Sequence, residues 1–102
     1  MKEVNENMKK QKTLTLKVGE KNIVSNPFDF EAMCLVNDEQ FKGRGSIACG
    51  RSAIPYMFQG TAVTDAVLNT LSIEVITKMS LEVWGFYLDA LASVNKKKSK
   101  NA

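Results

Sequence analysis

The sequence predicts an α+β domain, mainly helical, in which an N-terminal β-hairpin precedes three or four helices. Apolar residues first alternate with a period of two, and from residue 27 onward they recur at intervals of three and four. The 102 residues suffice for one domain with one core. We expect a single domain over residues 12–95, a flexible tail over residues 1–11 and a basic, disordered tail over residues 96–102.

The hairpin is predicted from strict alternation of polar and apolar residues over positions 13–18. Every second residue from Leu14 to Val18 should face the core. Residues 19–22 (Gly-Glu-Lys-Asn) have turn chemistry, and the apolar pair Ile23-Val24 follows them. This pair is therefore expected to form the returning strand.

The first helix is predicted over residues 27–38. Asn26 is a suitable N-cap, and Pro27 fits the first helical position, where its missing N–H is not needed. The acidic residues Asp29 and Glu31 would then lie in the first turn and favour the helix dipole. The expected core face of this helix consists of Phe30, Met33 and Cys34, flanked by Phe28 and Leu35.

A loop over residues 39–46 should lead into a second helix. Ser46 is the candidate cap, and the apolar pattern continues to Phe58 before Gly60 ends it. Pro55 lies inside this pattern, so we expect a kink or a break there.

Two more helices complete the prediction. Thr64-Asp65 should begin a short one that reaches Leu71, and Ser72 should cap the longest, over residues 73–94. The apolar stripe of this last helix is unusually wide, because Leu81, Trp84 and Leu88 extend it beyond half of the circumference.

A small domain cannot bury so wide a stripe, so part of it is expected to face a partner. Three neighbouring aromatic residues on this helix strengthen the expectation, because aromatic side chains dominate the energetics of interfaces. The candidate interface residues are Tyr56, Phe58, Met79, Val83, Trp84, Phe86, Tyr87 and Leu91.

Charge is distributed unevenly along the chain. Residues 1–12 carry four lysines and two glutamates, and residues 96–102 carry four lysines and no acidic residue. The remaining residues carry six basic and nine acidic side chains, so the predicted domain is mildly acidic. This balance argues against a DNA-reading domain and makes a nucleic-acid partner the weaker expectation. The alternative function is a small nucleic-acid-associated protein that uses its basic tails.

No constellation of catalytic residues is present in the sequence, and we expect neither enzymatic activity nor a cofactor. The chain has no histidine, which removes the commonest general base and the commonest metal ligand. Cys34 is expected in the core, whereas Cys49 could be exposed near Arg51, which would lower its pKa. Two cysteines without histidine do not form a zinc site.

Residues 45–52 (Gly-Ser-Ile-Ala-Cys-Gly-Arg-Ser) come nearest to a known functional motif. Their glycine spacing is that of a phosphate-binding P-loop, but Arg51 stands where the lysine is expected and polar residues precede them instead of a buried strand. A small nucleotide binder stays a third hypothesis. The preferred interpretation is a loop that leads into a helix whose small residues allow close packing.

The N-terminus is polar and charged and lacks the apolar region of a signal peptide. No apolar stretch anywhere in the sequence is long enough to span a membrane. We therefore expect a cytoplasmic protein with reduced thiols and no membrane partner.

Three segments resemble the tail assembly chaperones of long-tailed bacteriophages and prophages of Gram-positive bacteria. They are residues 13–19 (Thr-Leu-Thr-Leu-Lys-Val-Gly), residues 26–33 (Asn-Pro-Phe-Asp-Phe-Glu-Ala-Met) and residues 84–91 (Trp-Gly-Phe-Tyr-Leu-Asp-Ala-Leu). The resemblance covers about residues 12–95. It implies a non-enzymatic protein of the host cytoplasm that forms homo-oligomers, binds and solubilises the tape measure protein, and helps tail tube subunits assemble around it.

Overall fold

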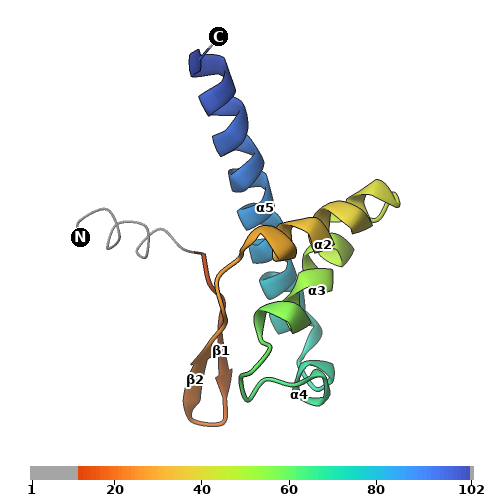
Figure 1. Cartoon of the computed structure of the whole chain (residues 1–102). Coiled ribbons are helices and arrows are strands. Elements are labelled where there is room, and N and C mark those ends of the chain that lie inside the picture. Colours follow the sequence, from red (N-terminus) through yellow and green to blue (C-terminus); the bar gives the residue numbers. More distant parts are fainter. Residues whose placement is uncertain (1–11, 102) are drawn as a thin grey trace, which may run out of the picture.

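A two-stranded antiparallel hairpin followed by four helices forms the described part of the chain, which confirms the predicted α+β, mainly helical fold class (Figure 1). The structure is a computed structural model that describes the backbone of residues 12–101 and the side chains of residues 12–94. The predicted N-terminal tail, residues 1–11, lies outside the described residues. The elements are β1 (Thr15–Val18), β2 (Lys21–Val24), α2 (Phe30–Phe41), α3 (Ser46–Met57), α4 (Asp65–Asn69) and α5 (Ile73–Asn101).

The hairpin closes in the way that its sequence predicts. Val18 pairs with Lys21 across a two-residue turn, and Gly19 adopts a φ of 64°, which a residue without a Cβ tolerates. Leu14 and Leu16 are buried in the core. At the open end, the backbone N–H of Ser25 donates to Leu14 O at 2.8 Å, and the backbone N–H of Leu14 donates to Ser25 Oγ at 2.8 Å.

Helix α2 begins at Phe30 rather than at residue 27, so the predicted capping role of Asn26 is wrong. Asp29 is the N-cap, and its Oδ1 accepts a hydrogen bond from the backbone N–H of Ala32 at 3.0 Å. The backbone N–H of Asn26 instead donates to Met57 O at 2.8 Å, and its side-chain amide donates to Gln59 O at 2.9 Å. Asn26 thereby satisfies the carbonyl of Met57, the last residue of α3, which the helix cannot pair internally, and that of Gln59 just beyond it.

The end of α2 also lies later than predicted, because residues 39–41 are helical. Gly43, with a φ of 84°, follows the C-cap. Its N–H donates to Gln40 O at 2.9 Å and the N–H of Arg44 donates to Glu39 O at 3.2 Å. These two bonds form a Schellman motif, which terminates the helix and shortens the predicted loop.

The predicted core face of α2 is confirmed for Met33 and the flanking Phe28, which pack half-buried against the core, and is wrong for Phe30. The buried residues of α2 are Ala32 and Val36, whereas Met33 and Cys34 are half-buried and Phe30 is 73% exposed. Two small or medium side chains let α2 lie close to α3, and the phenylalanine turns to solvent as a result.

Helix α3 begins with Ser46 as its first residue, and its N-cap is Gly45, which offers no side-chain hydrogen bond. Ser46 is therefore not the cap. The helix continues through Pro55 without a break and ends at Met57. Pro55 lies so close to this end that it removes only one hydrogen bond of the last turns. The predicted break is therefore absent.

The last two helix starts agree with their predicted caps. Thr64 Oγ1 accepts from the N–H of Val67 at 3.4 Å, and Ser72 Oγ accepts from the N–H of Val75 at 3.2 Å. Helix α4 ends at Asn69, short of the predicted Leu71. Helix α5 passes its predicted end at residue 94 and continues to Asn101, through most of the segment expected as a tail.

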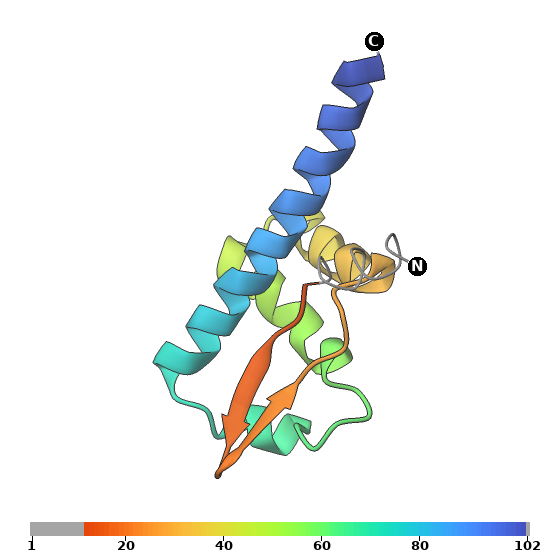
Figure 2. The same ribbon diagram turned by 90° about the vertical axis from the view of Figure 1, so that its left-hand side faces the viewer.

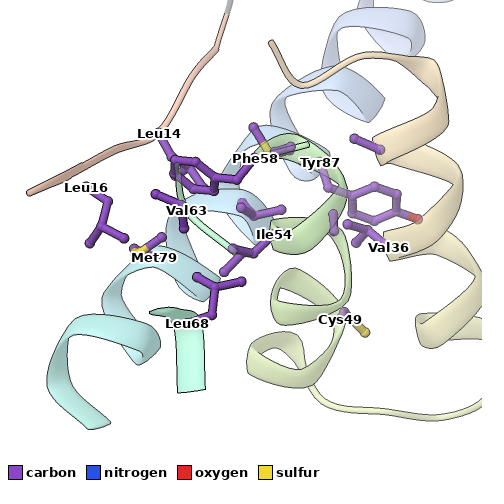
Figure 3. Packing of buried hydrophobic residues seen from close by; sticks show 14 residues of the cluster. Leu14, Leu16, Val36, Cys49, Ile54, Phe58, Val63, Leu68, Met79 and Tyr87 are labelled. Carbon is purple, nitrogen blue, oxygen red and sulfur yellow. The ribbon is translucent and has the colours of Figure 1, made fainter. Parts of the chain in front are cut away.

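The core lies between the hairpin and α2, α3, α4 and α5 (Figure 3). Helix α3 packs against α5 on one side and against α2 on the other. The C-terminal part of α5 extends beyond the other elements (Figure 2). Among the described elements, none covers the outer sides of α2 and α5.

Candidate protein-binding surface

The structure divides the eight predicted interface residues into two groups. Four of them have almost no exposed surface and belong to the core: Phe58, Met79, Val83 and Tyr87. The other four are half-buried and pack against that core: Tyr56, Trp84, Phe86 and Leu91. The first group forms part of the structural core and, in this fold, has no surface to offer to a partner.

The half-buried aromatic residues also have partners within the chain. Phe86 packs edge to face against Phe28, with ring centroids 5.8 Å apart. Trp84 lies over Tyr87 with centroids 5.3 Å apart. Their burial therefore anchors α5 to the rest of the fold, and only part of each ring remains available at the surface.

Tyr56 joins α3 to the start of α2. Its hydroxyl donates to Asp29 Oδ2 at 2.7 Å. The backbone N–H of Ala32, and with it this hydroxyl, holds the pKa of the Asp29 carboxyl below its usual value. The same hydrogen bond raises the pKa of Tyr56, because the ionised phenol could not donate it. Tyr56 thus fixes the cap of α2.

Tyr87 makes the corresponding connection near the other end of α2. Its hydroxyl lies 2.7 Å from Asn37 Oδ1 and 2.7 Å from Gln40 Oε1. A tyrosine hydroxyl has one hydrogen to donate, so one of these two amides must turn its NH₂ group toward it. Burial raises the pKa of Tyr87, which keeps the hydroxyl protonated as a donor.

An apolar row remains exposed on the outer side of α5. It consists of residues three or four positions apart, which share one face of a helix. Ile73 is 82% exposed, and Leu81 and Leu88 are each 45% exposed. Thr77 and Trp84 lie between them and are half-buried. We call these five residues the α5 outer row.

The beginning of the α5 outer row borders a shallow surface hollow, lined by Ile73, Thr77 and Leu81 together with Glu74, Lys78 and Glu82. The width of the apolar stripe had drawn attention to Leu81, Trp84 and Leu88. Ile73 was missed, although its position four residues before Thr77 and eight before Leu81 is the available signal.

A second apolar area lies on α2, where Phe30 is 73% and Phe41 92% exposed. Cys34, half-buried, is on the same side of the helix. This surface was not predicted from the sequence, because Phe30 and Cys34 were expected in the core and Phe41 in a loop.

The residues singled out for chemistry lie in structural positions. Cys49 is buried, and burial raises the pKa of its thiol, so the expected exposure beside Arg51 is wrong. Residues 46–52 belong to α3 and form no phosphate-binding loop. Within residues 12–94, no three potential ligands come together as a metal site. No helix in the described part of the chain is long and apolar enough to cross a membrane.

Comparison with protein-family models, with curated proteins and with solved structures gives no match for this chain.

Proposed function

We propose that this protein is a tail assembly chaperone of a long-tailed phage or prophage, which binds and solubilises the tape measure protein and assists assembly of tail tube subunits around it. The observation that carries the proposal is the α5 outer row, whose Ile73, Leu81 and Leu88 are exposed on one helix face. The resemblance of residues 13–19, 26–33 and 84–91 to that family supplies the identity of the partners.

An exposed apolar row favours binding because water hydrates it poorly. Covering apolar surface gains roughly 25 cal/mol per Å². Contiguous apolar patches on a folded domain commonly mark sites of protein interaction. From Ile73 to Leu88 the row rises about 22 Å along the helix axis. This length suits an amphipathic helix of a partner, lying side by side with α5.

The charge of the domain ranks the alternative function second. Acidic residues outnumber basic ones between positions 13 and 95, and such a body repels nucleic acid. A nucleic-acid-associated protein would have to rely on its terminal lysines, and its binding would fall steeply with salt.

Co-expression with the tape measure protein of the same genome tests the proposal. We expect the soluble fraction of that protein to rise several-fold when the full chain is present. The variant Leu81→Ser/Leu88→Ser should lose this effect, because it removes two apolar side chains of the α5 outer row. It should still fold, because both side chains are exposed and contribute little to the core. The matched control is Lys78→Ser/Glu82→Ser, which changes two exposed polar residues of the same helix and leaves the net charge unaltered.

Two results would contradict the proposal. An equally insoluble tape measure protein with and without the chain would rule out the chaperone function. Full activity of Leu81→Ser/Leu88→Ser, with loss of activity in the control, would remove the α5 outer row as its site.

A further inference from the structure

The exposed side of α2 combines aromatic and acidic residues. Phe30, Cys34, Asp38 and Phe41 are spaced by four, four and three positions, which places them along one helix face, and Glu31 lies beside them. Phe30 is 73% and Phe41 92% exposed. Glu31 and Asp38 are exposed as well. We call these five residues the α2 outer face.

The contacts of α2 keep this face turned outward. Near its start, the Asp29 carboxylate is held by the N–H of Ala32 at 3.0 Å and by the Tyr56 hydroxyl at 2.7 Å. Near its end, Asn37 and Gln40 bond the Tyr87 hydroxyl. A rotation that buried Phe30 and Phe41 would break these bonds, so their exposure follows from the fold.

The carboxylates of the α2 outer face have no cationic partner within residues 12–94. The two basic side chains that follow the helix both pair with Glu39, which lies on another side of α2. Lys42 Nζ is 3.1 Å from Glu39 Oε2, and Arg44 Nη1 is 3.4 Å from Glu39 Oε1. Helix α2 itself contains no lysine or arginine. The face therefore presents two aromatic rings beside two negative charges that no basic side chain of residues 12–94 pairs with.

We propose that the α2 outer face binds a basic amphipathic helix of a partner protein. Apolar side chains of that helix pack on Phe30 and Phe41, while its lysines or arginines pair with Glu31 and Asp38. The eleven-residue separation of the two rings rises roughly 16 Å, which corresponds to about three helical turns on each side of the contact. Charge complementarity sets the orientation and the choice of partner, and the aromatic contacts supply most of the affinity.

This inference rests on the proposed function only in taking the ligand to be a protein. It concerns a surface separate from the α5 outer row, and it adds the chemical class of what is recognised. The two can therefore fail independently.

Fluorescence anisotropy with two labelled probe peptides tests the inference on the full chain. The first peptide is an amphipathic helix of about 15 residues built from leucine and lysine, and the second has glutamate in place of every lysine. We expect saturable binding of the basic peptide only. Phe30→Ser/Phe41→Ser should abolish it, and circular dichroism should show unchanged helix content, since neither ring belongs to the core.

The charge contribution is measured with Glu31→Gln/Asp38→Asn. At low salt this variant should bind the basic peptide on the order of tenfold more weakly, and added salt should shrink the difference because exposed charges are screened. The matched control, Glu74→Gln/Glu82→Gln, removes two exposed acids from α5 and should bind like the parent chain.

Three outcomes would overturn the inference. Equal binding of the acidic peptide would remove charge recognition. Unchanged binding by Phe30→Ser/Phe41→Ser would place the site elsewhere. Conversion of an oligomeric chain to a monomer by that variant, without any effect on the peptide, would assign the face to a contact between copies. If the chain bound the basic peptide as expected but did not solubilise the tape measure protein, only the proposed function would be contradicted.

Discussion

Gly50 of α3 lies directly against the backbone of Ser80 in α5. A Cβ built on Gly50 would be 2.8 Å from the carbonyl carbon of Ser80 and closer still to its oxygen. Ser80 is buried, and its hydroxyl donates to Ile76 O at 2.7 Å, so it needs no partner from α3. The two helices touch backbone to backbone at this point, where α3 has a residue without a side chain.

Gly50→Ala should therefore destabilise the protein strongly. The methyl group has no space, so α3 must move away from α5, and overpacking of this kind typically costs between about 1 and 3 kcal/mol, occasionally more. Urea denaturation followed by circular dichroism should show a lower midpoint with an unchanged slope.

A second glycine provides the control for that substitution. Gly85 lies within α5, and a Cβ built on it meets nothing within 4 Å. Gly85→Ala should raise the free energy of unfolding by about 0.5–1 kcal/mol, because alanine is the better helix former. If the two substitutions lowered stability equally, backbone contact at Gly50 would not be the explanation.

The packing at Gly50 also shows what the sequence could predict. The spacing of small residues over positions 45–52 indicated close approach of a helix, and the structure confirms that interpretation. The hairpin and the caps Thr64 and Ser72 could be predicted because they depend on local patterns. The neighbour that approaches Gly50 could not be predicted, since contact with Ser80 joins residues distant in the chain.

The predicted start of α2 was wrong for a related reason. Asn26 and Asp29 are both good N-caps, and only the bonds of Asn26 to Met57 and Gln59 decide between them. Phe30 was expected in the core because it shares a helix face with Met33 and Cys34, and the apolar pattern did not show that Ala32 and Val36 are the buried residues. The candidate interface had the same weakness, because periodicity alone does not distinguish a buried aromatic residue such as Tyr87 from a surface one.

The cap of α2 gives a pH-dependent prediction. Hydrogen bonds from the Ala32 N–H and the Tyr56 hydroxyl lower the pKa of Asp29 from its ordinary value of 3.8. Its ionised form then stabilises the fold above pH 4, and this contribution is lost as the pH falls through the lowered pKa. Asp29→Ala should cost about 1 kcal/mol at pH 7 and make the acid limb of the stability curve shallower.

Asp29→Asn separates the cap from the charge. The amide oxygen still accepts from the Ala32 N–H, so the loss at pH 7 should be smaller than with alanine. The acid dependence should nevertheless decrease to the same extent, because no titratable carboxylate remains. Acid limbs as steep as that of the parent chain would assign the dependence to other groups.

The two cysteines should differ widely in reactivity. Cys34 is half-buried on α2, whereas Cys49 is buried and burial raises the pKa of its thiol. Iodoacetamide at pH 8 should modify Cys34 at least about a hundred times faster, since Cys49 must wait for local or global unfolding. Mass spectrometry of a time course measures both rates.

Serine substitutions assign the two phases of that reaction. Cys34→Ser should remove the fast phase and leave a slow one that denaturant accelerates. Disappearance of the fast phase in Cys49→Ser instead would mean that α3 opens readily at its N-terminal turn.

The hydroxyl of Tyr87 should contribute modestly to stability, although it connects α5 with α2. Tyr87→Phe removes the bonds to Asn37 and Gln40 but leaves the ring in the core. Both amide side chains belong to exposed residues and turn to water after the substitution, so neither is left buried without a partner. We expect the free energy of unfolding to fall by about 0.5–1.5 kcal/mol in urea denaturation.

Tyr87→Ala should cost about 3–5 kcal/mol, because it also opens a cavity beside Val36 (Figure 3). Equal losses for phenylalanine and alanine would show that the hydroxyl, rather than the ring, holds α2 against α5.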